Sequence, residues 1–182
     1  MKATGIVRRV DELGRLVIPK EIRRTMRLAE GTPLEIFTDR EGQIILKKYS
    51  PMMELGSFAK QYAESVAQTM NQKVAVSDRD QIIAVAGGGK RELLGKTISR
   101  QLEEMIINRE NSIQAGLDKK TIPLISGDED SYSAQAIYPI CCEGDCIGAV
   151  ILYSRENQTH FSETEYTAAA CAASFLGKQM EG

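Results

Sequence analysis

Short alternating runs of apolar and polar residues fill the first fifty positions, and this pattern favours short strands over long helices. Residues 4–10 and 16–18 are predicted strands, while residues 34–38 and 43–48 are predicted to pair as a hairpin around a polar turn. One short helix is expected over residues 20–27, because the proline before it presets φ for a first helical turn. The N-terminal part is therefore predicted to be rich in strands.

These elements carry too few apolar side chains to enclose a core of their own. A unit of about fifty residues without disulfides or a metal is marginal in stability. Two chains that contribute strands to one shared core would remove this difficulty. Homodimerisation through the N-terminal hairpins is therefore a physical expectation.

A second region begins after Tyr49, where Ser50 can cap a new helix and Pro51 can occupy its first turn. The helical spacing of large apolar residues predicts the face with which this helix packs. That stripe comprises Leu55, Phe58, Tyr62, Val66 and Met70. The predicted domains are residues 1–50 and residues 51–182.

The rest of this region alternates predicted strands with one internal helix near residues 99–109. The expected strands are residues 73–77, 81–86, 121–125, 133–141 and 146–153. The last two are joined by a tight turn at residues 143–145, which predicts neighbouring antiparallel strands. Mixed elements of this kind indicate an α+β chain whose second domain has a central antiparallel sheet.

A final helix has a clear start, because Ser162 and Glu165 match a capping box. Apolar residues then recur at spacings of three and four, at Tyr166, Ala169, Ala173, Leu176 and Met180. Such a seam can form a coiled coil, but two heptads with several alanines favour packing on the sheet. The first and last helices of this region could also pack across a dimer axis.

The net charge of −2 hides two parts of opposite sign. Residues 1–50 contain eleven Lys and Arg against seven Asp and Glu, whereas the remainder contains twelve against eighteen. This asymmetry suggests different partners for the two parts, with nucleic acid as the candidate partner of the basic part. Neither a long apolar run nor a secretory signal is visible, so we expect a soluble cytoplasmic protein without a membrane partner.

Five arginines form the strongest functional pattern in the basic part. They lie on a predicted strand, a turn and the short helix, at Arg8, Arg9, Arg15, Arg23 and Arg24. A guanidinium can donate two parallel hydrogen bonds to a phosphate or to guanine, which suits DNA binding. The alternative interpretation is a solvated basic face with scattered salt bridges to Asp11, Glu12 and Glu21.

The segment MKATGIVRRVDELGRLVIPKEIRR, together with LEIFTD and IILKKY, resembles the DNA-binding domain of AbrB-family transition-state regulators. In that family two chains interleave swapped hairpins into one β-barrel, so the resemblance implies an interleaved dimer that binds double-stranded DNA. The family's DNA-contacting arginines correspond to Arg8, Arg15, Arg23 and Arg24. Arg9 and Lys20 are auxiliary candidates because of their charge and position.

The second region is similar to a GAF domain, a sensory α/β module, most clearly in the segment IGAVILYSRENQTHFSETEYTAAACAASFLGKQM. Together the two resemblances span the chain and match a family of two-part regulators from spore-forming bacteria. Membership implies a homotetramer joined through the GAF-like helices, a place in the forespore, and activation or repression of late sporulation genes according to the promoter. The NKFDE-type residues of cyclic-nucleotide GAF domains are absent, so that ligand is not supported and any small-molecule ligand is unidentified.

The sequence offers little enzymatic or metal-binding chemistry, and we expect no catalytic residue, no cofactor and no metal. Cys141, Cys142 and Cys146 have a spacing that differs from common zinc motifs, and His160 is the only histidine. Separate thiols that pack as small apolar groups are the favoured interpretation, while a redox or metal role stays open. Residues 87–90 lack the phosphate-loop pattern and are predicted to be a flexible loop.

Two other functions stay open beside that of a DNA-binding transcription regulator. Related swapped-hairpin heads serve antitoxins that regulate their own genes. An antitoxin would continue into an extended acidic tail that wraps its toxin, whereas residues 52–182 have the pattern of a folded domain. A cysteine-based redox sensor is the second alternative. The regulator remains the favoured prediction.

Overall fold

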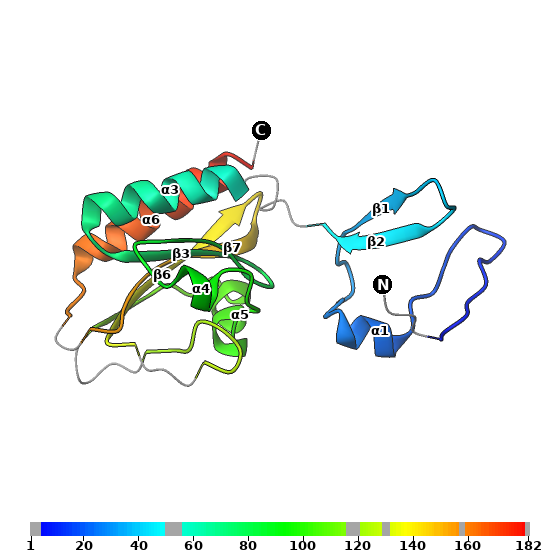
Figure 1. Ribbon diagram of the computed structural model, residues 1–182, viewed down its shortest axis with the longest axis horizontal. Coiled ribbons are helices and arrows are strands. Elements are labelled where there is room, and N and C mark those ends of the chain that lie inside the picture. The colour runs from blue at the N-terminus through cyan, green and yellow to red at the C-terminus, as the bar shows by residue number, and fades with distance from the viewer. Residues whose placement is uncertain (1–4, 50–55, 116–120, 129–131, 157–158, 181–182) are drawn as a thin grey trace. The chain divides into compact units, whose positions relative to one another are not determined.

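The computed structural model describes residues 5–49, 56–115, 121–128, 132–156 and 159–180 (Figure 1). The chain divides into two compact units, Met1–Tyr49 and Ser50–Gly182, which we call the head and the tail. In the part of the chain that the structure describes, no helix has both the length and the apolar character required to cross a membrane.

Within residues 5–49, the head contains one hairpin (Figure 1). Strands β1 (Leu34–Thr38) and β2 (Ile44–Lys48) pair antiparallel, so the predicted hairpin is confirmed. The Asp39 carboxylate organises the turn between them by accepting two backbone N–H groups, both at 2.9 Å. This is the local chemistry for which Asp is favoured in turns.

Helix α1 (Lys20–Thr25) follows the predicted start but is shorter than the predicted span of residues 20–27. Met26 adopts φ −91° and ψ 3°, and Arg27 has a φ of 50°. These angles lie outside the helical region, so the backbone leaves the helix two residues early.

The predicted strands over residues 4–10 and 16–18 are wrong for a single chain. Thr4 lies outside the described residues, and the described part of both stretches forms no β-ladder. A strand exists through hydrogen bonds to a neighbour, and the ladder that the structure describes in the head joins β1 to β2. Val7 and Val17 are accordingly 84% and 72% exposed.

The tail is built on a five-stranded antiparallel sheet with the order β4-β3-β7-β6-β5 (Figure 1). Four of these strands are those that the sequence predicted, and β5 is new. The strands are β3 (Lys73–Asp78), β4 (Ile82–Ala86), β5 (Ser112–Ala115), β6 (Ala134–Cys142) and β7 (Asp145–Ser154).

The predicted strand over residues 121–125 is wrong, because β5 occupies the place beside β6. The side-chain amide of Gln135 replaces a strand partner for Ile122. It accepts the Ile122 backbone N–H at 2.9 Å and donates to the Ile122 carbonyl at 2.7 Å. A buried side chain thus satisfies the backbone that the apolar pattern assigned to a ladder.

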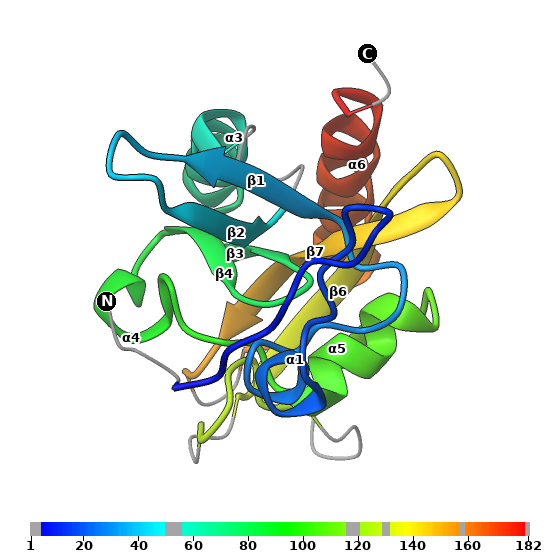
Figure 2. The same ribbon diagram turned by 90° about the vertical axis from the view of Figure 1, so that its right-hand side faces the viewer.

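Helices cover both faces of the sheet, as Figure 1 and Figure 2 show. Helices α3 (Gly56–Met70) and α6 (Glu163–Lys178) lie on one face, while α4 (Lys90–Leu93) and α5 (Arg100–Ile107) lie on the other. The core beneath α3 and α6 is rich in alanine, whereas the core beneath α4 and α5 contains larger isoleucine and leucine side chains.

The buried face of α3 differs from the predicted stripe. A row of small side chains is buried instead: Ala59, Ala63 and Ala67. Small residues let the helix backbone approach the sheet and α6 closely, which large residues at these positions would prevent. Of the predicted stripe, Phe58 is 47% exposed and Leu55 lies outside the described residues. The others are half-buried, namely Tyr62, Val66 and Met70.

Helix α6 begins as predicted, with a complete capping box at Ser162. The Glu165 carboxylate accepts the Ser162 backbone N–H at 2.7 Å, and the Ser162 hydroxyl accepts a backbone N–H of the first turn at 3.2 Å. The centre of the predicted seam is buried in the core beneath the helix, at Ala169, Ala173 and Leu176. Packing on the sheet, the favoured interpretation of this helix, is confirmed.

Candidate nucleic-acid interface

The six predicted DNA-contacting side chains all belong to the head, and all are exposed. Arg8 and Arg9 lie on the extended N-terminal segment, and Arg15 follows the turn at residues 12–14. The remaining three lie on α1, at Lys20, Arg23 and Arg24. Their exposure leaves six positive charges accessible to a polyanion.

Asp11 organises the turn that presents Arg15. Its Oδ1 accepts the backbone N–H of Leu13 at 3.0 Å and that of Arg15 at 2.8 Å, and Gly14 takes a φ of 74°. Its Oδ2 accepts the Nε–H of Arg15 at 2.8 Å. This salt bridge to Asp11 is one of those that the alternative interpretation, a solvated basic face, expected. The backbone N–H of Arg15, and then its guanidinium, hold the pKa of Asp11 below its usual value.

Helix α1 presents Arg23 and Arg24 in its last turn, where cations interact favourably with the helix dipole. The buried Pro19 precedes the helix, and its carbonyl accepts the backbone N–H of Arg23 at 2.9 Å. The proline thereby anchors the start of the helix while the two guanidinium groups stay exposed.

Arg8 and Arg23 border two neighbouring hollows in the head. Arg8 lines an apolar hollow of about 270 Å³, and Arg23 lines the second hollow. Val17, Ile18 and other apolar residues line both. The structure therefore brings Arg8 and Arg23 to a common apolar surface, whereas the remaining four candidates are not among the residues that line it: Arg9, Arg15, Lys20 and Arg24.

The head encloses few of its apolar side chains. Pro19 is the single buried residue among those described in the head. Ile36 and Ile44 of the hairpin are 66% and 71% exposed. Leaving apolar surface in water costs about 25 cal/mol per Å². The head of one chain therefore does not enclose a complete hydrophobic core.

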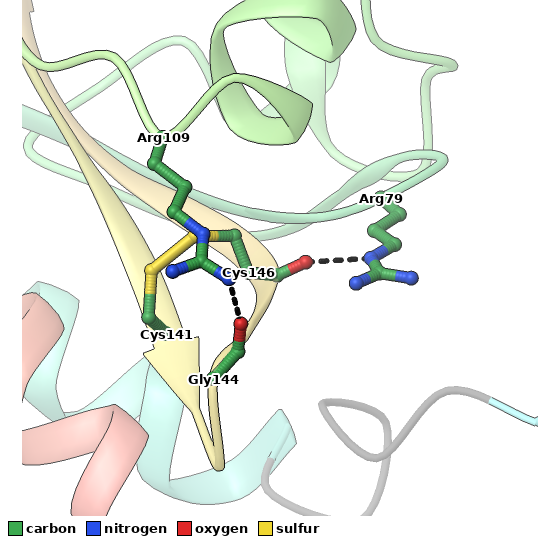
Figure 3. Close-up of a disulfide and its surroundings, with 5 residues drawn as sticks. All are labelled: Arg79, Arg109, Cys141, Gly144 and Cys146. Atoms are coloured by element: carbon green, nitrogen blue, oxygen red, sulfur yellow. Dashed lines mark hydrogen bonds between the residues drawn. A yellow bond between two sulfur atoms is a disulfide. The ribbon is translucent and has the colours of Figure 1, made fainter.

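A disulfide joins Cys141 and Cys146 near the turn of the β6–β7 hairpin, as Figure 3 shows. The two residues are direct cross-strand partners, so the hairpin register brings their side chains together. Arg109 donates to the carbonyl of Gly144, and Arg79 donates to that of Cys146 at 2.6 Å. The interpretation of these cysteines as separate packing thiols is therefore wrong for this pair, because the spacing did not reveal the register.

The other two cysteines lie outside the disulfide. Cys142 is half-buried and Cys171 is exposed. Over the ranges that the structure describes, His, Cys, Asp and Glu side chains form no group of three or more that could hold a metal ion.

No sequence pattern pointed to a polar cluster around Arg155 in the tail. The guanidinium donates to the Glu92 carboxylate at 2.8 Å and to the Tyr132 hydroxyl at 3.2 Å. The Tyr132 hydroxyl donates in turn to the Asp128 carboxylate at 2.5 Å. These residues come from distant positions in the chain, so no local motif could have revealed the cluster.

Tyr153, whose ring packs edge-on against Tyr132 of this cluster with centroids 5.6 Å apart, contacts the glycine-rich loop that the sequence predicted to be flexible. The Tyr153 hydroxyl donates to the carbonyl of Gly88 at 3.1 Å. Burial raises the pKa of Tyr153 to about 12, and burial also raises that of Tyr132 well above its usual value. A Cβ at Gly89 would lie 2.6 Å from the Tyr153 hydroxyl, so this glycine allows the loop to approach β7.

The exposed cationic surface on a strand-rich head, joined to a folded α/β tail, is the arrangement of a two-part DNA-binding transcription regulator. The tail has the fold of GAF domains. The GAF domain of phosphoenolpyruvate-protein phosphotransferase from Acinetobacter matches with a TM-score of 0.57 at 11% identity, over 88% of this chain and 89% of that one. At this identity the likeness concerns the fold alone.

The chain belongs to the stage V sporulation protein T family. The family model described as "Stage V sporulation protein T C-terminal, transcription factor" matches residues 54–181. Stage V sporulation protein T of Bacillus subtilis (strain 168) is 49% identical over 181 residues, which are 100% of this chain and 99% of that relative.

The head has relatives of its own. The family model described as "Antidote-toxin recognition MazE, bacterial antitoxin" matches residues 7–53. The transition state regulatory protein AbrB of Bacillus subtilis (strain 168) is 66% identical over 53 residues, which are 29% of this chain and 54% of that protein. The predicted α+β chain with an AbrB-like head and a GAF-like tail is confirmed.

Proposed function

We propose that this protein is a DNA-binding transcription regulator of late sporulation genes, which it activates or represses according to the promoter. The exposed cationic set on the AbrB-like head carries this proposal. Most of its affinity comes from neutralising phosphates, since lysine and arginine displace the counterions that surround DNA. We propose the forespore cytoplasm as its place of action, which rests on the resemblance to stage V sporulation protein T.

The individual contacts follow from the resemblance to AbrB and from exposure. Arg8, Arg15, Arg23 and Arg24 are the proposed principal DNA contacts. Arg9 and Lys20 are auxiliary phosphate contacts. In a symmetric dimer this set occurs twice about a two-fold axis, which fits a DNA site with two similar halves.

A second copy of the chain is the proposed partner that completes the head. The apolar hollow beside Arg8 and the exposed isoleucines of the hairpin favour this partner, and so do the predicted strands, whose described part forms no β-ladder in one chain. Interleaved hairpins would give the segments around Val7 and Val17 a ladder and cover their side chains. The head would then be a closed β-barrel made by two chains.

Mobility-shift titrations test the DNA contacts, with genomic fragments that the wild-type protein itself enriches as the probe. We expect Arg15→Ala and Arg23→Ala each to weaken binding on the order of ten-fold or more, without unfolding the chain. With about eight phosphate contacts, log K should fall against log salt with a slope of about −7. Arg91→Ala, at an exposed position of α4 in the tail, removes the same charge and should leave affinity nearly unchanged. Wild-type affinity in both folded head variants would refute the proposal.

The tail is the proposed site of assembly of head dimers into tetramers. Phe58, Tyr62 and Phe175 form an aromatic patch on α3 and α6, in which Tyr62 stacks on Phe175 with ring centroids 5.0 Å apart. Exposed aromatic side chains are typical of interface centres. Sedimentation should show that Phe58→Ser with Phe175→Ser converts tetramers to dimers and leaves the head dimer intact. A variant that remains tetrameric would exclude the patch.

The GAF-like fold of the tail also supports sensing of an unidentified small molecule. A thermal-shift screen of metabolites against the whole chain tests this role. Stabilisation by one chemical class would support it, and a broad screen without a stabilising compound would favour assembly as the single role of the tail.

A redox role is the second candidate function, and the disulfide between Cys141 and Cys146 favours it. Disulfides are rare in the reducing cytoplasm, and those found there are commonly transient or redox-sensing. DNA affinity measured with and without a dithiol reductant tests this role. Equal affinities would leave the disulfide with a structural role only.

A further inference from the structure

The turn before Arg15 holds both the backbone and the side chain of that arginine through one carboxylate. Asp11 accepts the Arg15 backbone N–H at 2.8 Å and the Arg15 Nε–H at 2.8 Å. The Asp11 backbone N–H also donates to the Arg15 carbonyl at 3.0 Å, which closes the turn. The carboxylate itself is oriented by the Leu13 backbone N–H at 3.0 Å.

This geometry occupies the side of the guanidinium that DNA contacts need least. An arginine has five N–H donors, and the bond to Asp11 involves the one on Nε. The two terminal nitrogens carry the other four, and these form the fork that binds guanine or phosphate in a bidentate manner. Arg15 can therefore keep its bond to Asp11 while its terminal edge binds DNA.

A carboxylate beside a DNA-contacting arginine weakens the electrostatic attraction between the protein and DNA. Its negative charge repels phosphates and so weakens binding to every DNA sequence. The pKa of Asp11 lies below its usual value, so this charge is present at neutral pH. If Asp11 favours DNA binding at all, it must do so by restricting the conformation of Arg15, whose long side chain otherwise samples many rotamers.

We propose that Asp11 is a positioning residue that fixes the Arg15 guanidinium for sequence-selective contact with DNA. The inference rests on the proposed function, in which Arg15 is a DNA contact. A fixed fork matches the donor and acceptor pattern of particular bases, whereas a mobile one is attracted to any phosphate. Asp11 thereby raises the ratio of specific to non-specific affinity and lowers affinity for DNA in general.

Asp11→Asn is the decisive substitution. Asn keeps an oxygen that accepts the backbone N–H groups of Leu13 and Arg15, so the turn is retained. It places an uncharged amide against the Arg15 Nε–H and so removes the ion pair. Asp11→Ser, which also keeps an acceptor for the turn, serves as a second variant if the first lowers the melting temperature of the head.

The measurement is the dissociation constant for two probes. One is a 30-bp duplex selected by the wild-type protein from a random pool, and the other is a scrambled duplex of the same composition. We expect the selectivity ratio of Asp11→Asn to fall about five-fold or more, which is the lower end for one bidentate base contact. Binding to the scrambled duplex should stay equal or become tighter. Glu12→Gln makes an equal charge change at the neighbouring exposed position. This control should raise the affinity for both duplexes alike and leave the selectivity ratio unchanged.

A double-mutant cycle separates this inference from the proposed function. In an Arg15→Ala background, Asp11→Asn should leave the selectivity ratio unchanged, because the side chain that it positions is gone. Arg15→Ala with wild-type affinity and selectivity would refute the proposed function. Weak binding by Arg15→Ala, combined with a wild-type ratio for Asp11→Asn or with additive effects of the two changes, would overturn the positioning role alone.

Discussion

Gly177 lies where α6 passes close to the backbone of β6. A Cβ added to this residue would lie 2.3 Å from the carbonyl oxygen and 3.3 Å from the carbonyl carbon of Cys141. Both atoms belong to the backbone of β6, which cannot rotate away as a side chain could. Gly177→Ala must therefore move the helix or the strand.

Two opposing contributions determine how much Gly177→Ala changes the free energy of unfolding. Alanine in place of glycine inside a helix stabilises it by about 1 kcal/mol. Overpacking a filled core costs about 1–3 kcal/mol, and a collision between backbone segments belongs at the upper end of this range. Gly177→Ala should thus lower the free energy of unfolding of the tail by about 2 kcal/mol.

Urea unfolding followed by tyrosine fluorescence measures this change, because five of the six tyrosines lie in the tail and the chain has no tryptophan. Gly56→Ala is the matched control, since a Cβ at this α3 residue meets nothing within 4 Å. The control should be neutral or stabilising by up to about 1 kcal/mol. If Gly177→Ala were as stable as the control, α6 would not sit against Cys141 as described.

Two further predictions concern buried polar groups of the tail. Burial raises the pKa of Tyr153 from an ordinary value of 10.0 to about 12, so the unfolded chain loses this proton at a lower pH than the folded one. The free energy of unfolding should therefore be unaffected by this group below pH 10 and should fall as the pH rises towards 12. Equilibrium unfolding at a series of alkaline pH values should show that Tyr153 accounts for a fall of at most about 3 kcal/mol in the free energy of unfolding. Tyr153→Phe should make the free energy of unfolding depend less steeply on pH. An unchanged pH dependence would contradict the raised pKa. Gln135→Ala leaves the Ile122 backbone N–H and carbonyl without their partner and should destabilise the tail by about 2–3 kcal/mol in urea unfolding. A loss below about 0.5 kcal/mol would mean that water replaces the amide.

Local backbone chemistry made several elements predictable from the sequence. The hairpin in the head depends on the Asp39 turn, and the start of α6 depends on the reciprocal bonds between Ser162 and Glu165. Such signals extend over a few residues, so their physical cause lies within the window that a sequence pattern covers. The uneven distribution of charge and the candidate arginines were visible for the same reason, since they need only composition and position.

Packing between distant segments decided the features that the sequence left open or predicted wrongly. The apolar pattern of α3 identified its large residues, but close approach to the sheet requires small ones, so the alanine row is buried and Phe58 is exposed. Residues 121–125 have the composition of a strand, yet Gln135 satisfies Ile122 and β5 takes the place beside β6.

Contacts across long sequence separations explain the remaining differences. The Arg155 cluster gathers residues from distant positions, and the disulfide depends on the register of β6 against β7. In the head, the sequence alone indicated that the apolar residues are too few to enclose a core, and the exposed Val7 and Val17 agree with that. Periodicity records which residues are apolar, whereas volume, register and partners at a distance determine which of them are buried.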